Sequence, residues 1–175
     1  MEERGFAALS IQHLADALDF SKGNFYHHLE SKEELLNEIF VDTLQFGLAN
    51  ISAIFAREEP LPQKLEALVE FYVSIMTTRR AVMLVWFKER AHLTATHLSE
   101  VTNLERQVDA KLEAFYAEGI AAGLFKPLDP DVIRLAVFGM CFMLTKLPQP
   151  VSPTLTARIT HQLREFVSTG LVVSS

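Results

Sequence analysis

The chain has 175 residues, of which 49% are hydrophobic and 22% are charged, so it can form one compact domain or a small module joined to a larger one. Its single cysteine, Cys141, excludes an intramolecular disulfide and favours a reducing compartment. The N-terminus has no signal-peptide pattern, and the longest apolar run, residues 135–144, is too short to span a bilayer. We therefore expect a cytoplasmic protein with no membrane span.

The charge distribution leaves open whether the chain binds nucleic acid. The net charge is −6, and residues 1–40 carry eight acidic and three basic residues, a local net charge of −5. A DNA-binding surface is normally basic. Three alternatives follow: this stretch does not bind DNA, its few basic groups are well placed, or part of the binding module is missing.

The N-terminal third predicts three helices in close succession. Apolar positions over residues 11–18 fall on one helical face, with Ser10 as the N-cap. A short helix over residues 22–28 follows, capped by Ser21. The run Ser31–Glu34 is a capping box that opens a third helix.

The remaining residues also predict helices only, because alternation typical of strands is absent from the sequence. Gly47 is the expected place for a bend, and Gly123 is expected to end a helix. Asp129 is the expected N-cap of the next helix, with Pro130 in its first turn, and the last helix is expected to end at Gly170. The expected helices span residues 32–57, 62–78, 80–93, 97–122, 130–147 and 153–169. The fold class is therefore all-α.

The second short helix has the residues of a DNA reader. Two short helices joined by a tight turn form a helix-turn-helix, whose second helix can lie in the major groove. Gly23 costs such a helix about 1 kcal/mol relative to alanine, and a close approach of the backbone to DNA would explain it. Tyr26 and Lys32 can bind phosphates, whereas Asn24 and His27 can reach base edges or phosphates.

The run GFAALSIQHLADALDFSKGNFYHHLESKEELL, residues 5–36, resembles the DNA-binding domain of the TetR family of bacterial transcriptional regulators. It departs from the family pattern at Asp19, Phe20 and Leu29. The matching positions are Gly5, Phe6, Ser10, Leu14, Ala15, Ser21, Gly23, Tyr26, His28, Lys32, Glu33 and Leu35. The resemblance implies DNA contacts by Ser10, Lys22, Gly23, Asn24, Tyr26, His27 and Lys32, with Lys22 among the base readers.

The resemblance also implies the organisation of the chain. The family has a helix before the Gly-Phe pair, whereas only four residues precede Gly5 here, so we expect that helix to be largely missing. Residues 1–44 are then a helix-turn-helix domain, and residues 45–175 are a helical-bundle domain for effector binding and dimerisation. Residues 112–140 are similar to the C-terminal domain of a TetR subgroup in which acyl-CoA-type effectors are common. The expected function is a ligand-responsive regulator, most simply a repressor released by a small hydrophobic or acyl-CoA-like effector.

The candidate effector pocket consists of aromatic and sulfur-bearing side chains of the middle helices, with one arginine. Apolar pockets usually carry a few polar anchors, and Arg90 could bind a carboxylate or a phosphate. For each apolar candidate a plain core position is the stronger alternative, and for Arg90 a solvated surface position is. The candidates are Phe71, Tyr72, Met76, Trp86, Phe87, Arg90, Phe115, Tyr116 and Met140.

The expected partners are a palindromic double-stranded DNA operator, a small-molecule effector and a second copy of the chain. The segment 130–147 is too apolar to face water, so it and the segment 153–169 are expected to pair with their copies in a C₂ four-helix bundle. A two-fold dimer suits a palindromic operator.

No enzyme, cofactor or metal site is expected from the sequence. No nucleophile–base spacing or phosphate-binding loop is present, and the adjacent His27 and His28 point about 100° apart on a helix, which disfavours a shared metal ion. The alternative function is a helical dimer that binds a small molecule or a protein and retains a vestigial, non-DNA-binding helix-turn-helix.

Overall fold

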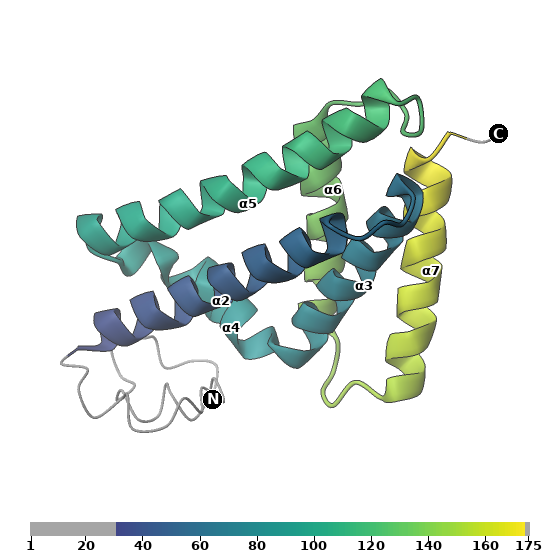
Figure 1. The fold of residues 1–175 in the computed structure, drawn as a ribbon. Helices are drawn as coiled ribbons and strands as arrows, with labels where there is room; N and C mark the ends of the chain where they lie inside the picture. The colour runs from purple at the N-terminus through teal and green to yellow at the C-terminus, as the bar shows by residue number, and fades with distance from the viewer. Residues whose placement is uncertain (1–30, 174–175) are drawn as a thin grey trace. The chain divides into compact units, whose positions relative to one another are not determined.

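The computed structural model describes residues 31–173, apart from the side chain of Lys32, as helices joined by short loops. Within this range no β-strand is present, and only an isolated bridge joins Phe125 to Val172. The α-helices are α2 (Lys32–Phe55), α3 (Leu61–Thr78), α4 (Arg80–Glu89), α5 (Ala95–Ala121), α6 (Pro130–Phe142) and α7 (Pro153–Leu171), with short 3₁₀ helices η3 (Arg90–His92) and η4 (Met143–Lys146) (Figure 1). The all-α prediction is confirmed.

Side-chain caps fix the beginnings of three helices. The Ser31 hydroxyl accepts a hydrogen bond from the Glu34 N–H at 3.1 Å, as the capping box predicts. Asp129 accepts from the Asp131 N–H at 2.8 Å and opens α6. Ser152 opens α7 in the same way. The first backbone N–H groups of a helix have no helical partner, so each cap satisfies a donor that would otherwise be unpaired.

Several predicted helix boundaries were wrong. Helix α2 runs through Gly47, as the predicted helix 32–57 does, but it ends at Phe55, and α7 continues past Gly170 to Leu171. The predicted helix 80–93 changes at Glu89 into the 3₁₀ helix η3, and the predicted helix 130–147 changes at Phe142 into η4. In η4 the Thr145 hydroxyl donates to the Phe142 carbonyl at 2.8 Å, which supports the tighter turn.

Two glycines are required near the end of α5. Gly123 has φ of 69°, a left-handed conformation that side chains rarely adopt, and it ends the helix as predicted. At Gly119 a Cβ atom would lie 2.0 Å from the Phe125 ring. The Phe125 N–H also donates to the Gly119 carbonyl at 3.0 Å. The bare backbone at Gly119 therefore allows Phe125 to close over the helix end.

The chain forms two compact units. Unit 1 comprises Met1–Phe46 and Ala81–Glu105, and unit 2 comprises Gly47–Arg80 and Arg106–Ser175. Helices α2 and α5 each contribute one part to unit 1 and the other part to unit 2. The predicted domain boundary between residues 44 and 45 remains a prediction. The described part of unit 1 buries Leu35, Leu36, Ile39, Phe40, Val82, Met83, Leu93 and Val101.

Helix α3 forms the centre of unit 2 and packs against α6 and α7. Its buried face consists of Leu65, Leu68, Val69, Tyr72, Val73, Ile75 and Met76. Tyr72 meets Phe138 of α6 edge to face, with the ring centroids 5.6 Å apart. On the α7 side, Arg164 pairs with Glu66 and Glu70 of α3. The apolar contacts and the charged pairs together hold these three helices side by side.

Candidate functional site

Most predicted DNA-contacting residues lie outside the described residues. These are Ser10, Lys22, Gly23, Asn24, Tyr26 and His27. Lys32 is the first residue of α2, but its side chain is not described. Their roles in DNA binding therefore remain predictions.

Within unit 1, the first turns of α2 are attached to the beginning of α5 by a polar seam, formed by Glu33, Asn37, Thr94, His97 and Glu100. The Glu33 carboxylate accepts from the Thr94 N–H at 2.6 Å and lies 2.9 Å from His97 Nδ1. The buried Asn37 amide donates to Glu100 at 3.0 Å. The hydrogen bond from Thr94, followed by the contact with His97, lowers the pKa of Glu33 below its ordinary value. The seam therefore holds the first turns of α2, which follow the predicted DNA-binding helix of residues 22–28 in the sequence.

Arg90 is engaged inside unit 1. Its guanidinium pairs with Glu105 at 2.5 Å and donates to the Thr102 hydroxyl at 3.1 Å. The hydrogen bond with Glu105 raises the pKa of Arg90 above its ordinary value. Because this carboxylate already neutralises the guanidinium, Arg90 is a poorer anchor for an anionic ligand than an unpaired cation would be.

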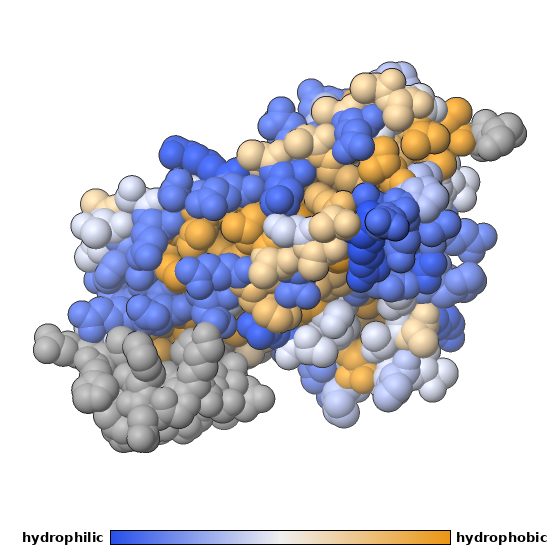
Figure 2. All heavy atoms as spheres, viewed as in Figure 1, coloured by the Kyte–Doolittle hydropathy of each residue, from blue (hydrophilic) through white to orange (hydrophobic). Residues whose placement is uncertain are grey.

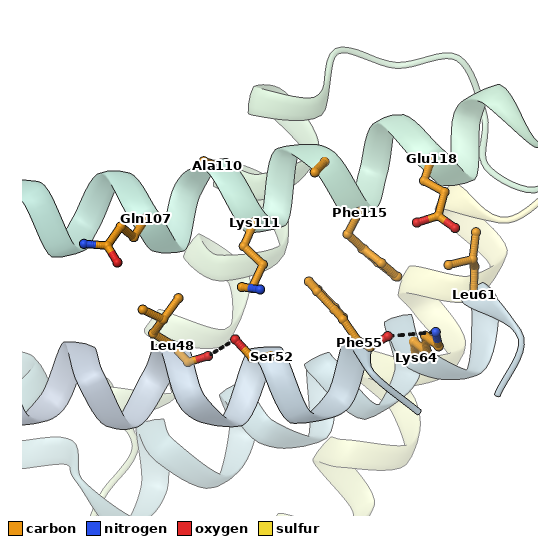
Figure 3. A pocket seen from close by; sticks show the side chains of 11 residues that line it. Leu48, Ser52, Phe55, Leu61, Lys64, Gln107, Ala110, Lys111, Phe115 and Glu118 are labelled. Carbon is orange, nitrogen blue, oxygen red and sulfur yellow. Dashed lines mark hydrogen bonds between the residues drawn. The ribbon is translucent and has the colours of Figure 1, made fainter. Parts of the chain in front are cut away.

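Unit 2 contains an open cavity of about 720 Å³ between the second half of α2, the beginning of α3 and the second half of α5. Apolar residues reach the surface between these parts of α2 and α5 (Figure 2). The lining residues are Leu48, Ser52, Phe55, Leu61, Lys64, Gln107, Ala110, Lys111, Ala114, Phe115 and Glu118 (Figure 3). A few polar groups in a mostly apolar wall are typical of small-molecule sites.

A stacked aromatic pair lies in the middle of the lining of this cavity. The rings of Phe55 and Phe115 are nearly parallel, with centroids 4.1 Å apart and planes inclined by 8°. In Figure 3 the two rings meet between α2 and α5, with Lys111 on one side of them and Lys64 on the other. We call the Lys111 side, lined by Leu48, Ser52, Gln107, Ala110 and Lys111, the inner compartment, and the side lined by Leu61, Lys64 and Glu118 the outer compartment.

The two lysines of the cavity have different surroundings. The Lys64 ammonium donates to the Phe55 carbonyl at 2.8 Å, at the negative C-terminal end of α2. Glu118 lies in the same outer compartment. For Lys111, which is half-buried, the structure gives no hydrogen-bond or ion-pair partner within residues 31–173. The inner compartment therefore carries the uncompensated positive charge.

The predicted pocket residues are distributed over both units. Phe115 lines the cavity. Tyr72, Met76 and Tyr116 are buried in the core of unit 2, and burial raises the pKa of both tyrosines above the ordinary value. Phe71 and Met140 are half-buried in unit 2. Trp86, Phe87 and Arg90 belong to unit 1, where Trp86 packs on Phe40 with centroids 4.7 Å apart and Phe87 is exposed.

Sequence reasoning missed the other cavity residues because it considered only aromatic and sulfur-bearing side chains of the middle helices, with Arg90 as the polar anchor. One signal was present: Gln107, Lys111 and Phe115 follow one another at i, i+4 spacing, which places them on one face of α5. The wall from α2 and the contribution of Lys64 depend on tertiary packing and have no comparable local signal.

No helix in residues 31–173 is both long and apolar enough to cross a membrane, and this range holds no group of three His, Cys, Asp or Glu placed to bind a metal ion. The described architecture is thus that of an all-α protein with a polar N-terminal seam and a separate ligand-sized cavity.

Comparison with known protein families assigns the chain to a family. Residues 58–146 match the tetracyclin repressor-like C-terminal domain, and residues 1–39 match the bacterial regulatory proteins of the tetR family. The chain belongs to the TetR family, and it is accordingly a DNA-binding transcriptional regulator.

Relatives support the same class along nearly the whole chain. The HTH-type transcriptional repressor KstR2 of Mycolicibacterium smegmatis is 22% identical over 98% of this chain and 85% of its own length. The structure of the ketosteroid regulator KstR2 of Mycobacterium tuberculosis matches with a TM-score of 0.80 at 22% identity, covering 98% of this chain and 89% of that one. AibR, solved with isovaleryl coenzyme A and operator DNA, matches with a TM-score of 0.73 at 22% identity, covering 95% and 89%. At this identity the two structures establish the fold.

Proposed function

We propose that the protein is a transcriptional repressor that leaves its operator when a small hydrophobic or acyl-CoA-like effector occupies the cavity of unit 2. The observation that carries the proposal is this cavity, which has the size and the mixed lining of a ligand site and lies in a chain whose residues 1–39 match the DNA-binding part of the family. KstR2 is named a repressor, and AibR was solved with an acyl-CoA. The effector would act by binding one conformation of the regulator more tightly than the other.

A homodimer is part of this proposal. Four large apolar side chains on the last helices are exposed in the single chain: Val132 and Leu135 of α6, at 59% and 61%, Met143 of η4, at 60%, and Phe166 of α7, at 69%. Apolar groups gathered on consecutive elements favour burial against a partner surface. We propose that the segments 130–147 and 153–169 pair with their copies, so that the dimer reads a palindromic operator. A cytoplasmic location follows from DNA as the target.

Gel-shift titration tests the DNA-binding part. The protein is titrated against the DNA beside its own gene and against a shuffled duplex of equal length, at several salt concentrations. We expect a preference for the native sequence that survives at high salt, because base contacts depend on salt less than phosphate contacts do. Equal affinity for both duplexes at every salt concentration would refute a specific operator.

The net charge of −5 in residues 1–40 favours one alternative, a helical dimer that binds a small molecule or a protein and retains a vestigial helix-turn-helix. The variants Tyr26→Phe and Lys32→Ala discriminate the two functions. If the segment binds DNA, both variants should weaken binding, and Lys32→Ala should also lower the salt dependence, because one phosphate contact is lost. If the segment is vestigial, the wild-type protein and both variants will show the same weak binding.

A further inference from the structure

The effector site can be specified further from its charges, on the basis of the proposed function. The cavity contains two ammonium groups and one carboxylate, from Lys64, Lys111 and Glu118. In the outer compartment Lys64 is held by the Phe55 carbonyl, and Glu118 is the second charge. A ligand anion placed there would meet a carboxylate and an ammonium that already has an acceptor.

The inner compartment is a more favourable environment for a ligand anion. Lys111 reaches from α5 into the space beside Ser52 of α2 (Figure 3). The Ser52 hydroxyl donates to the Leu48 carbonyl at 2.6 Å, so its proton is committed and only its lone pairs face the compartment. Lys111 is therefore the cationic donor of this compartment. Leu48, Ala110 and one side of the aromatic stack supply apolar contact around it.

We propose that the cavity selects a small apolar monocarboxylate, whose carboxylate pairs with Lys111 and whose apolar body lies against the Phe55–Phe115 stack. One uncompensated cation matches one negative charge. A coenzyme A thioester carries several phosphate charges and no free carboxylate, so this lining matches it less well than a free acid. Lys111 thus determines specificity, whereas Lys64 holds the end of α2.

Isothermal titration calorimetry with decanoate, the uncharged decanamide and decanoyl-CoA tests this assignment. For the wild-type dimer we expect decanoate to bind at least about tenfold more tightly than decanamide, consistent with a charge-assisted hydrogen bond. Lys111→Met keeps the apolar stem and should remove this preference, whereas Lys111→Arg should keep most of it. Lys64→Met is the matched control on the other side of the stack and should leave the preference unchanged.

The assignment would be overturned by equal binding of decanoate and decanamide, by equal loss of the preference in Lys111→Met and Lys64→Met, or by binding of decanoyl-CoA alone. Absence of binding by all three compounds would also overturn it. Circular dichroism melts confirm that each variant is folded. The gel shift is read separately, so specific DNA binding without a Lys111-dependent ligand refutes only this assignment. A Lys111-dependent ligand without DNA binding refutes only the regulatory function.

Discussion

At the scale of single residues, the environment of a charge decides its role. Lys111 and Lys64 both line the cavity. Lys111 faces the open space of the cavity, whereas the Lys64 ammonium donates to the Phe55 carbonyl at the end of α2. Arg90, which the sequence offered as a ligand anchor, is paired with Glu105. Since the sequence reports the residue type and not its partner, it could not rank these three cations.

The Glu33 carboxylate should make unit 1 sensitive to acid. Its pKa is lowered in the folded protein, so the folded state favours the ionised form. This contribution to stability is present above the ordinary pKa of 4.5 and is lost as the pH falls through the lower folded value. We expect Glu33→Gln to lower the melting temperature at pH 7 and to match the wild type progressively as the pH falls below 4.5.

The control for this titration is Glu38→Gln, an exposed carboxylate on the same helix. The difference in melting temperature between Glu38→Gln and the wild type should change less with pH than the difference for Glu33→Gln. If the melting temperature of Glu33→Gln stays equally far below that of the wild type across the acid range, the seam does not depend on the ionised carboxylate.

Among the helices, side-chain caps and periodicity were good predictors, whereas glycines predicted helix ends only in part. Ser31 and Asp129 open helices as the sequence indicates, because a cap depends on residues a few positions apart. The single helix predicted through Gly47 is observed, and Gly123 ends α5 as expected, whereas α7 continues past Gly170 to Leu171. The cavity was missed for a related reason: its walls come from three helices, and only the α5 wall shows a local spacing.

Two alanine substitutions test this reading of the glycines. At Gly47 a Cβ atom would meet nothing within 4 Å, and the residue lies inside α2, so Gly47→Ala should raise the free energy of unfolding by roughly 0.5–1 kcal/mol. At Gly119 the Cβ would overlap the Phe125 ring, so Gly119→Ala should destabilise the protein. Urea titration measures both. Destabilisation by Gly47→Ala would indicate that a bend at this position is needed after all.

For the complete protein, the dimer proposed above would bury the exposed apolar residues of α6, η4 and α7. A carboxylate at the centre of such an interface is costly to bury. We expect Leu135→Glu to shift the protein from dimer to monomer in light scattering and to weaken operator binding. Ala117→Glu, on an exposed position of α5, is the matched control and should leave the dimer intact. A Leu135→Glu protein that stays dimeric would place the interface elsewhere.

If ligand in the cavity controls DNA binding, fluorescence anisotropy of a labelled operator will detect the release of the protein. A ligand that binds by calorimetry is titrated into the wild-type complex and into an Ala114→Phe complex, in which the larger side chain fills the cavity wall. We expect ligand to lower the anisotropy of the wild-type complex and to leave the Ala114→Phe complex bound. An equal response of both complexes, or no response of the wild type at saturating ligand, would contradict it.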